Sequence, residues 1–208
     1  MRIVAARELQ DWLAHGTVLE KDSRGPKVVH LETGLILKIF HTRRHPWFAR
    51  LNPPAQRFAQ NAKTLRELSI PAPRVVENVW LDRAKGLSAC IYQPLPGTSL
   101  ESVFKESPEK MERLFPALAV FIMTLHMNGI YFRSLHLGNI LHISGDSFGL
   151  IDFLDLTKKP RKLSKWETKR NLEHLRNYLQ RRKLTNFPID TLLHHYHFAS
   201  QSQKAGLQ

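Results

Sequence analysis

The feature that most constrains the fold is a short hairpin with one polar residue at each end. Two apolar stretches, 140–143 and 148–151, are separated by Ser-Gly-Asp-Ser, which is typical of a tight turn between two strands. Asn139 comes directly before the first stretch, and Asp152 comes directly after the second. Each residue alone would be ordinary, but Gly-Asn, a hairpin and Ile-Asp-Phe together favour a metal-binding pair. Their oxygen atoms suit Mg²⁺, which binds through few protein ligands together with phosphate oxygens and water.

The order of the remaining elements predicts an α+β protein with two lobes. With 208 residues, of which 42% are hydrophobic, the chain suits one compact domain or two lobes that share a cleft. Strands dominate the first half and helices the second. We therefore expect a β-rich N-terminal lobe over residues 1–96 and a mainly helical C-terminal lobe over residues 97–208. A turn-rich connector at 94–100 separates the two lobes.

Hydrophobic periodicity predicts the elements of the N-terminal lobe. We expect helices within residues 1–20 and near 58–68, and strands at 27–31, 35–40, 75–80 and 87–92. The first helix has Leu9, Trp12 and Leu13 on one face. Residues 41–53 are basic, aromatic and rich in proline, so we expect no regular structure there. Cys90 lies in an apolar strand, which favours a core residue over a nucleophile.

In the C-terminal lobe we expect one long helix before the hairpin and mostly helices after about Ser164. This long helix is expected to end before Gly129. Its predicted buried stripe consists of Leu114, Leu118, Phe121, Ile122 and Leu125. Residues 201–208 are polar and unpatterned, and we expect them to be disordered. No apolar stretch is long enough for a bilayer and no signal peptide is apparent, so we expect a cytoplasmic protein, at most peripheral at the inner membrane.

Positive charge is concentrated in one segment. The formal net charge is +13, and residues 158–183 hold eleven Lys or Arg against two Glu. Three interpretations compete: a solvated helix face, attraction to an acidic membrane surface or lipopolysaccharide phosphates, and nucleic-acid binding. We favour an anionic partner or substrate, which charge alone does not name. Trp166, Tyr178 and Phe187 interleave with this segment, and their helical spacing favours core packing over stacking on bases.

The segment before the hairpin matches the catalytic loop of protein kinases, with changes. That loop normally reads His-Arg-Asp-Leu-x-x-x-Asn, and its Asp orients or deprotonates the phosphoryl acceptor. Here Arg133, Leu135 and Asn139 fit the pattern, but Ser134 holds the Asp position and Phe132 holds the His position. Upstream, Lys38 closes a Leu-Ile-Leu-Lys strand similar to Val-Ala-Ile-Lys, whose lysine holds nucleotide phosphates.

Together these pieces resemble the small bacterial kinase-like proteins of the toluene-tolerance group. That group is related to the lipopolysaccharide Kdo and heptose kinases and to the Bud32/RIO group. The resemblance covers most of the chain, from Leu19 to about Leu179. Besides the lysine strand, the hairpin and the loop, it rests on Ser-Ile-Pro-Ala-Pro at 69–73, Tyr-Gln-Pro-Leu-Pro-Gly at 92–97 and Leu-His-x-x-Gly-Ile at 125–130.

The resemblance implies a protein-kinase-like fold and a role for each matching residue. Lys38 would hold the phosphates of ATP, and Asn139 with Asp152 would hold Mg²⁺. The adenine would meet backbone groups of a hinge formed by Tyr92, Gln93 and Leu95. Gly25 would lie in the loop that covers the phosphates, although a single glycine there also fits an ordinary turn.

Two departures bear on activity. Ser134 cannot act as a base near neutral pH, and a positioned base typically contributes ~10²–10⁴-fold to rate. The helix position that should offer a glutamate to Lys38 holds Asn61. His136 could compensate for the missing base or could pack and hydrogen-bond within the loop, and we favour packing. Asp155 could support a second ion or cap the next segment, and we favour the cap.

Three functional hypotheses follow. The first is an ATP- and Mg²⁺-dependent atypical kinase that phosphorylates an anionic sugar or lipopolysaccharide-type acceptor at the inner membrane face. The second is a pseudokinase, a nucleotide-binding or regulatory module without phosphotransfer. The third, which we rank last, is a basic protein that associates with nucleic acid, because no base-reading motif accompanies the charge.

Overall fold

The chain forms two compact units, each with its own core. The computed structural model describes residues 1–41 and 46–205. The first unit contains Met1–Glu67 and Ala72–Leu95, and the second contains Leu68–Pro71 and Pro96–Gln208. The sheet-rich N-terminal part and helical C-terminal part make the protein α+β. The units divide between Leu95 and Pro96, where the expected boundary followed residue 96, and residues 68–71 belong to the second unit.

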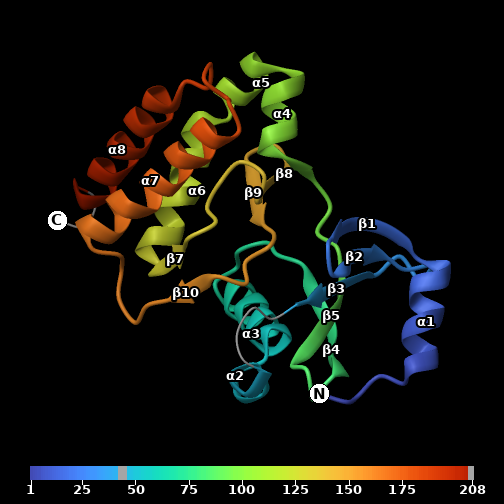
Figure 1. Cartoon of the computed structure of the whole chain (residues 1–208). Helices are drawn as coiled ribbons and strands as arrows, with labels where there is room; N and C mark the ends of the chain where they lie inside the picture. Colours follow the sequence, from blue (N-terminus) through green and yellow to red (C-terminus); the bar gives the residue numbers. More distant parts are fainter. Residues whose placement is uncertain (42–45, 206–208) are drawn as a thin grey trace. The chain divides into compact units, whose positions relative to one another are not determined.

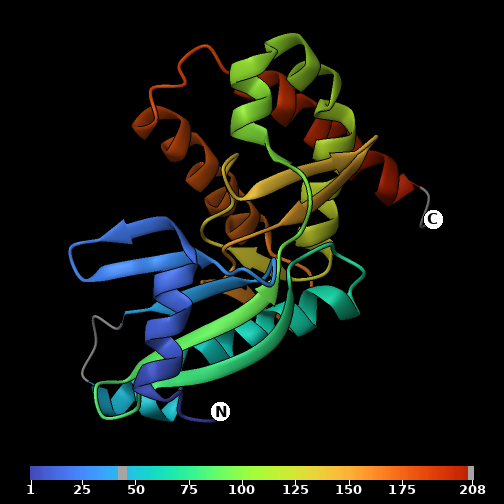
Figure 2. The ribbon, with the colours of Figure 1, turned by 90° about the vertical axis from the view of Figure 1, so that its right-hand side faces the viewer.

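The first unit is a five-stranded antiparallel sheet with helices (Figures 1 and 2). The strands run in the order β1-β2-β3-β5-β4. In chain order the elements are α1 (Ala6–His15), β1 (Thr17–Asp22), β2 (Gly25–His30), β3 (Ile36–Phe40), α2 (Pro46–Leu51), α3 (Pro54–Glu67), β4 (Arg74–Asp82) and β5 (Leu87–Gln93).

The two faces of this sheet carry different cores because side chains alternate along a strand. Leu37 and Ile39 of β3 belong to one hydrophobic cluster, against which α1 packs. This confirms the expected apolar face of α1, since Leu9, Trp12 and Leu13 make the contact. Phe40 of β3 faces the other way, with its ring centroid 5.6 Å from that of Phe58 on α3.

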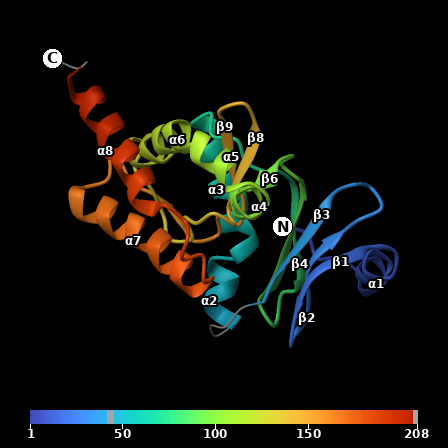
Figure 3. The same ribbon diagram turned by 90° about the horizontal axis from the view of Figure 1, so that it is seen from above.

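The second unit combines helices with two small sheets. The strand order is β6-β8-β9 in one sheet and β10-β7 in the other. Figures 1 and 3 show α6, α7 and α8 on the same side of the β8–β9 hairpin. In chain order the elements are β6 (Thr98–Ser99), α4 (Leu100–Glu106), α5 (Pro108–Arg113), α6 (Phe115–Met127), β7 (Ile130–Phe132), β8 (Ile140–Ser144), β9 (Ser147–Leu150), β10 (Leu156–Lys158), α7 (Lys165–Arg181) and α8 (Ile189–Ala205).

Several elements differ from the expectation. Helix α2 forms within 41–53, where we expected no regular structure; Pro46 stands at its first position, which tolerates proline. Residues 42–45 lie outside the described part of the chain. The expected long helix before the hairpin is three helices, because Ser107 caps α5 ahead of Pro108 and a second proline, Pro116, opens α6. The predicted disorder of 201–208 is wrong for 201–205, which continue α8, while 206–208 are not described.

Other expectations are confirmed. The predicted hairpin is β8 and β9, and residues after Ser164 are mostly helical. Cys90 is fully buried, and burial raises the pKa of its thiol to about 12. Across residues 1–41 and 46–205, the structure contains no helix with the length and apolar character needed to cross a membrane.

A buried polar network connects three helices of the second unit to β7. The Asn171 amide on α7 is fully buried; its Nδ2 donates to the carbonyl of Phe132 at 2.5 Å, and its Oδ1 lies 3.0 Å from His126 Nε2. His126 Nδ1 lies 2.8 Å from the hydroxyl of Tyr196 on α8. Burial lowers the pKa of His126 from 6.5 to about 4, despite the opposing hydrogen bond to Asn171. The imidazole is therefore neutral in the folded protein near pH 7.

This network predicts a pH dependence of stability. The unfolded chain takes up the His126 proton near pH 6.5 and the folded protein only near pH 4. Between these values the unfolded state holds more protons, so the free energy of unfolding should fall by about 1.4 kcal/mol per pH unit as pH decreases. Urea unfolding of wild type and His126→Gln at pH 4.5, 5.5 and 6.5 measures this. We expect a flatter profile for the variant, and the wild-type profile for His194→Gln, an exposed control on α8. Equal slopes for wild type and His126→Gln would contradict the assignment.

Candidate functional site

The β8–β9 hairpin brings Asn139 and Asp152 to the same end. Ile140 pairs with Leu150, and the Ile151 N–H donates to the Asn139 carbonyl at 3.0 Å, so the two polar residues flank the last rung of the ladder. Asp152 has a left-handed backbone with φ of 52°. Aspartate visits this region more readily than most residues, and such positions cluster at functional sites.

The orientation of Asn139 is fixed by the segment 133–139, here called the Ser134 loop. Its backbone N–H donates to the His136 carbonyl at 2.9 Å, and its side-chain Nδ2 donates to the Ser134 carbonyl at 3.1 Å. With the amide nitrogen committed to the loop, the amide oxygen is the atom available to a cation. Asn139 is buried and Asp152 is exposed, so the pair combines a fixed amide with an accessible carboxylate.

The Ser134 hydroxyl donates to Asp155 Oδ2 at 2.6 Å. The other carboxylate oxygen, Oδ1, is buried and accepts no hydrogen bond from the described residues. This contact corrects the expectation that Asp155 is a cap: the next element is strand β10, not a helix. Because β10 pairs with β7, with Leu156 opposite Phe132, Asp155 is returned to the start of the Ser134 loop.

The far end of the loop packs on a buried carboxylate. Glu101 of α4 is only 9% exposed and accepts hydrogen bonds from Arg182 Nη2 at 2.7 Å, from Lys105 Nζ at 2.6 Å and from the Tyr178 hydroxyl. The Glu101 backbone N–H also donates to the Leu137 carbonyl at 3.1 Å. Burial alone would raise the pKa of Glu101, but these donors lower it to about 2. The carboxylate is thus ionised at neutral pH and joins α4 to α7, and the backbone of the same residue joins α4 to the loop.

His136 stacks on the same cluster. Its ring lies parallel to that of Tyr178, with centroids 4.0 Å apart and planes 2° apart. Burial lowers the pKa of His136 and raises that of Tyr178 to about 12, with the hydrogen bond to Glu101 adding to the second shift. His136 Nδ1 is buried without a hydrogen-bond partner among the described residues. This geometry favours the packing role for His136.

The close packing of Tyr178 and His136 around Gly138 leaves little room for a side chain at this position. A Cβ at this position would lie 2.9 Å from the Tyr178 hydroxyl and 3.4 Å from His136 Nδ1. Because that hydroxyl is bonded to Glu101, it has little freedom to move away.

In the first unit, Lys38 lies on the sheet face that carries α3. It is paired across the sheet with Cys90, and its Nζ lies 5.8 Å from the ring centroid of Phe58. Asn61, three residues after Phe58 on α3, shares that helix face. The glutamate of α3, Glu67, is the last residue of the helix and lies 3.8 Å from Lys63 in an exposed ion pair.

The remaining predicted nucleotide contacts lie at strand ends of the first unit. Tyr92 and Gln93 end β5, and Leu95 is the last residue of the unit. Gly25 opens β2 with φ of 117°, a conformation that favours glycine, in the turn after β1. The structure therefore brings Ser134, His136, Asn139 and Asp152 together in the second unit and distributes the other candidates over the first.

Within residues 1–41 and 46–205, no group of three or more His, Cys, Asp or Glu side chains is placed to hold a metal ion. The donors at the hairpin end are one amide and one carboxylate oxygen, a set that fits Mg²⁺ bound jointly with phosphate oxygens. Comparison with models of protein families found no family that matches the chain, and a search of curated proteins found no matching relative.

The Glu101 cluster gives a stability prediction. Glu101→Gln removes the charge that Arg182 and Lys105 contact, and we expect it to lower the free energy of unfolding at pH 7 by roughly 2–3 kcal/mol. The cost stays below that of a fully buried pair because both cations are about half exposed. The group has a depressed pKa, so its contribution is present above pH 4.5 and is lost as pH falls toward about 2. Urea unfolding should show the difference from wild type shrinking in that window.

Glu106→Gln, at an exposed position of the same helix, is the matched control and should have little effect. A loss at Glu106→Gln as large as at Glu101→Gln would mean that net charge, rather than the cluster, sets the stability.

Proposed function

We propose that this protein is an atypical kinase-like phosphotransferase that transfers the terminal phosphoryl group of ATP, with Mg²⁺, to an anionic sugar or lipopolysaccharide-type acceptor. Its resemblance to the toluene-tolerance group and the lipopolysaccharide kinases supports this proposal, as does the arrangement of Asn139 and Asp152 around one hairpin end. The same features support a protein-kinase-like fold for the two units.

One observation favours activity over a pseudokinase: the Asp155 carboxylate lies 2.6 Å from Ser134 Oγ. The sequence lacks a carboxylate at the loop position that orients the acceptor, but the fold supplies one from 21 residues away. A serine hydroxyl bonded to a carboxylate can accept a proton on one side while it gives its own proton to the carboxylate.

The proposed chemistry follows from this hydrogen bond between Ser134 and Asp155, which are here called the dyad. As the acceptor oxygen bonds to the terminal phosphorus of ATP, its proton passes to Ser134 Oγ, and the Ser134 proton passes to Asp155 Oδ2. The bond from that phosphorus to the bridging oxygen of ADP breaks, and ADP leaves. Asn139 and Asp152 would hold Mg²⁺, which supplies charge neutralisation on the phosphates.

The other residues take the roles that the resemblance implies. Lys38 is proposed to hold the nucleotide phosphates, Gly25 to lie in the covering loop, and Tyr92, Gln93 and Leu95 to meet the adenine. The basic segment 158–183 is proposed to meet the anionic acceptor or an acidic membrane surface on the cytoplasmic side. Nucleic acid remains the less favoured partner.

The proposal predicts Mg²⁺-dependent turnover with a specific dependence on two aspartates. In an ATPase assay with and without Mg²⁺, Asp152→Asn should abolish measurable turnover, because it removes a metal ligand. Asp155→Asn should lower turnover by ~10²–10⁴-fold, the range for loss of a positioned base. Asp146→Asn, in the exposed turn of the same hairpin, is the matched control and should be unaffected.

Ser134→Asp separates the alternatives. If neither wild type nor Ser134→Asp turns over ATP, yet Mg²⁺–ATP raises the thermal midpoint, the protein is a pseudokinase. If wild type is active and Asp155→Asn equals it, the dyad has no catalytic part.

A further inference from the structure

An open, cationic groove lies beside the Ser134 loop, wholly within the second unit. This groove, here called the α7 groove, has a volume of about 420 Å³ and is lined by Arg133, Lys159, Arg170, Tyr131, Trp166 and His174. A second hollow of about 370 Å³ continues along α7 and shares Trp166, Arg170 and His174 with the first. A volume near 400 Å³ is in the range of small-molecule sites.

Two guanidinium groups in this groove are available to an anion. Neither Arg133 nor Arg170 forms an ion pair with a carboxylate in the described part of the chain. The groove's carboxylate, Glu167, is committed to Arg161 at 2.8 Å, to the Ser164 backbone N–H, and more loosely to Lys159 at 3.8 Å. The planar guanidinium fork matches phosphate and carboxylate groups better than an ammonium does.

Trp166 adds an apolar face to the same groove. Its side chain is 64% exposed, which corrects the expectation of core packing; Tyr178 and Phe187 are buried as expected. The Arg170 guanidinium lies 5.2 Å from the centre of the indole, so one face of the ring carries a cation and the rest meets solvent. An exposed aromatic ring beside cations suits a ligand ring that has both an apolar face and a negative group.

The pKa of His174 is sensitive to the positive charges of the groove. Its Nε2 lies 3.2 Å from the Tyr131 hydroxyl, and its pKa is lowered by burial first and then by Arg133 and Arg170, against the opposing effects of Asp155 and Glu173. An anion bound by the two arginines would offset their charge and raise the pKa of His174. Anion binding should therefore be accompanied by proton uptake, so affinity should rise as pH is lowered.

The groove and the Ser134–Asp155 pair both use the Ser134 loop, the groove through Arg133 and the pair through Ser134. Arg133 directly precedes Ser134, and the Asp155 carboxylate that accepts the Ser134 hydrogen bond also acts electrostatically on His174. A ligand anchored on Arg133 and Arg170 would thus be held in part by the loop residue next to Ser134, whose hydroxyl is proposed to take the acceptor proton.

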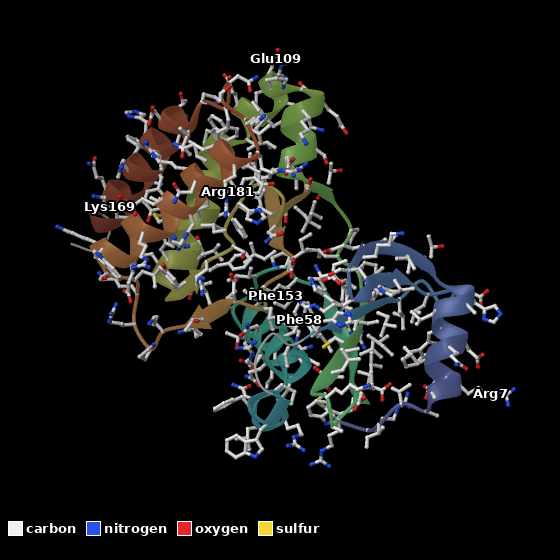
Figure 4. The ribbon with its side chains drawn as sticks, viewed as in Figure 1. Arg7, Phe58, Glu109, Phe153, Lys169 and Arg181 are labelled. Carbon is white, nitrogen blue, oxygen red and sulfur yellow. The ribbon has the colours of Figure 1, made fainter. Side chains whose placement is uncertain are left out.

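We propose that the α7 groove is the acceptor site, and that it binds a sugar carrying a carboxylate or phosphate group, with the anion on Arg133 and Arg170 and the ring against Trp166. This inference rests on the proposed function, which it deepens by naming the acceptor class and its location. A nucleic acid is the less favoured ligand. Single-strand binding uses several stacking aromatics. Among its described residues, α7 exposes Trp166 and no other large aromatic. Figure 4 labels Lys169 and Arg181, which lie toward the two ends of this helix.

The test measures binding to the full chain without nucleotide, so that it does not depend on turnover. Calorimetric titration with D-glucuronate and with glucose 6-phosphate should give saturable binding, and neutral glucose should bind at least tenfold more weakly. Trp166→Ala and Arg170→Gln should each raise Kd about tenfold or more. Lys165→Gln, an exposed neighbour outside both hollows that loses the same charge, should change Kd less than twofold. Unchanged thermal midpoints verify folding.

The pH arm uses D-glucuronate, whose carboxylate does not titrate in the range used. Its affinity should rise from pH 7.5 to 5.5 in wild type, and His174→Asn should flatten that rise. Equal binding of glucose and glucuronate, or affinities insensitive to Trp166→Ala and Arg170→Gln, would overturn the inference. So would tighter binding of single-stranded RNA with the same residue dependence.

Failure of the inference and failure of the proposed function are distinguishable. If the groove binds the anionic sugars but the protein never turns over ATP, the kinase proposal and the acceptor role fail together, and a sugar-anion site remains. If ATP turnover occurs but the groove variants change neither sugar binding nor transfer to these sugars, the acceptor assignment fails and the kinase proposal stands.

Discussion

The second unit depends on one buried carboxylate. Glu101 accepts hydrogen bonds from two cations and one phenol, and its own backbone N–H reaches back to Leu137 in the Ser134 loop. These bonds join α4 to α7 through the carboxylate and α4 to the loop through the backbone, while His136 of the loop stacks on Tyr178. Separating α4 from α7 would leave a buried charge unpaired. Leaving such a charge unpaired is among the costliest single events in a protein interior. The loop therefore presents Ser134 and Asn139 from a fixed backbone.

The other end of the loop is held by an amide instead of a charge. Asn171 fixes the Phe132 carbonyl just before the loop, and it is itself fixed by His126, which contacts α8 through Tyr196. Every polar group in this chain of contacts has a partner, which is the condition under which a buried polar network stabilises one arrangement. The loop is thus anchored at both ends on helices.

The parts of this architecture that were predictable are those with a local signal. The hairpin was predictable because a turn sequence separates two apolar stretches, and α1 because Leu9, Trp12 and Leu13 share a face. Strands β7 and β10 were not, because three-residue strands give no periodicity. Their pairing brings Asp155 to Ser134. The contact between these two residues, 21 positions apart in the chain, therefore has no local signal in the sequence. The predicted core packing of Trp166 is wrong because helical spacing alone does not say which face of α7 a residue occupies. Trp166 lies nine residues, or two and a half turns, before the buried Leu175, and therefore on the opposite face of α7.

The exposed face of α7 also forms part of the α7 groove beside the Ser134 loop. A helix with its apolar stripe toward the core must turn the opposite side outward, and on α7 that side carries Trp166 and Arg170 next to Arg133. The geometry that buries Leu175 also exposes the cations, and the short β7–β10 pair places a carboxylate at their edge. Ser134 alone reads as the loss of a catalytic aspartate. Its hydrogen bond to Asp155 and its place beside a cationic groove support the proposed acceptor site instead, with the negative charge supplied by the residue just before β10 and the hydroxyl between that charge and the acceptor.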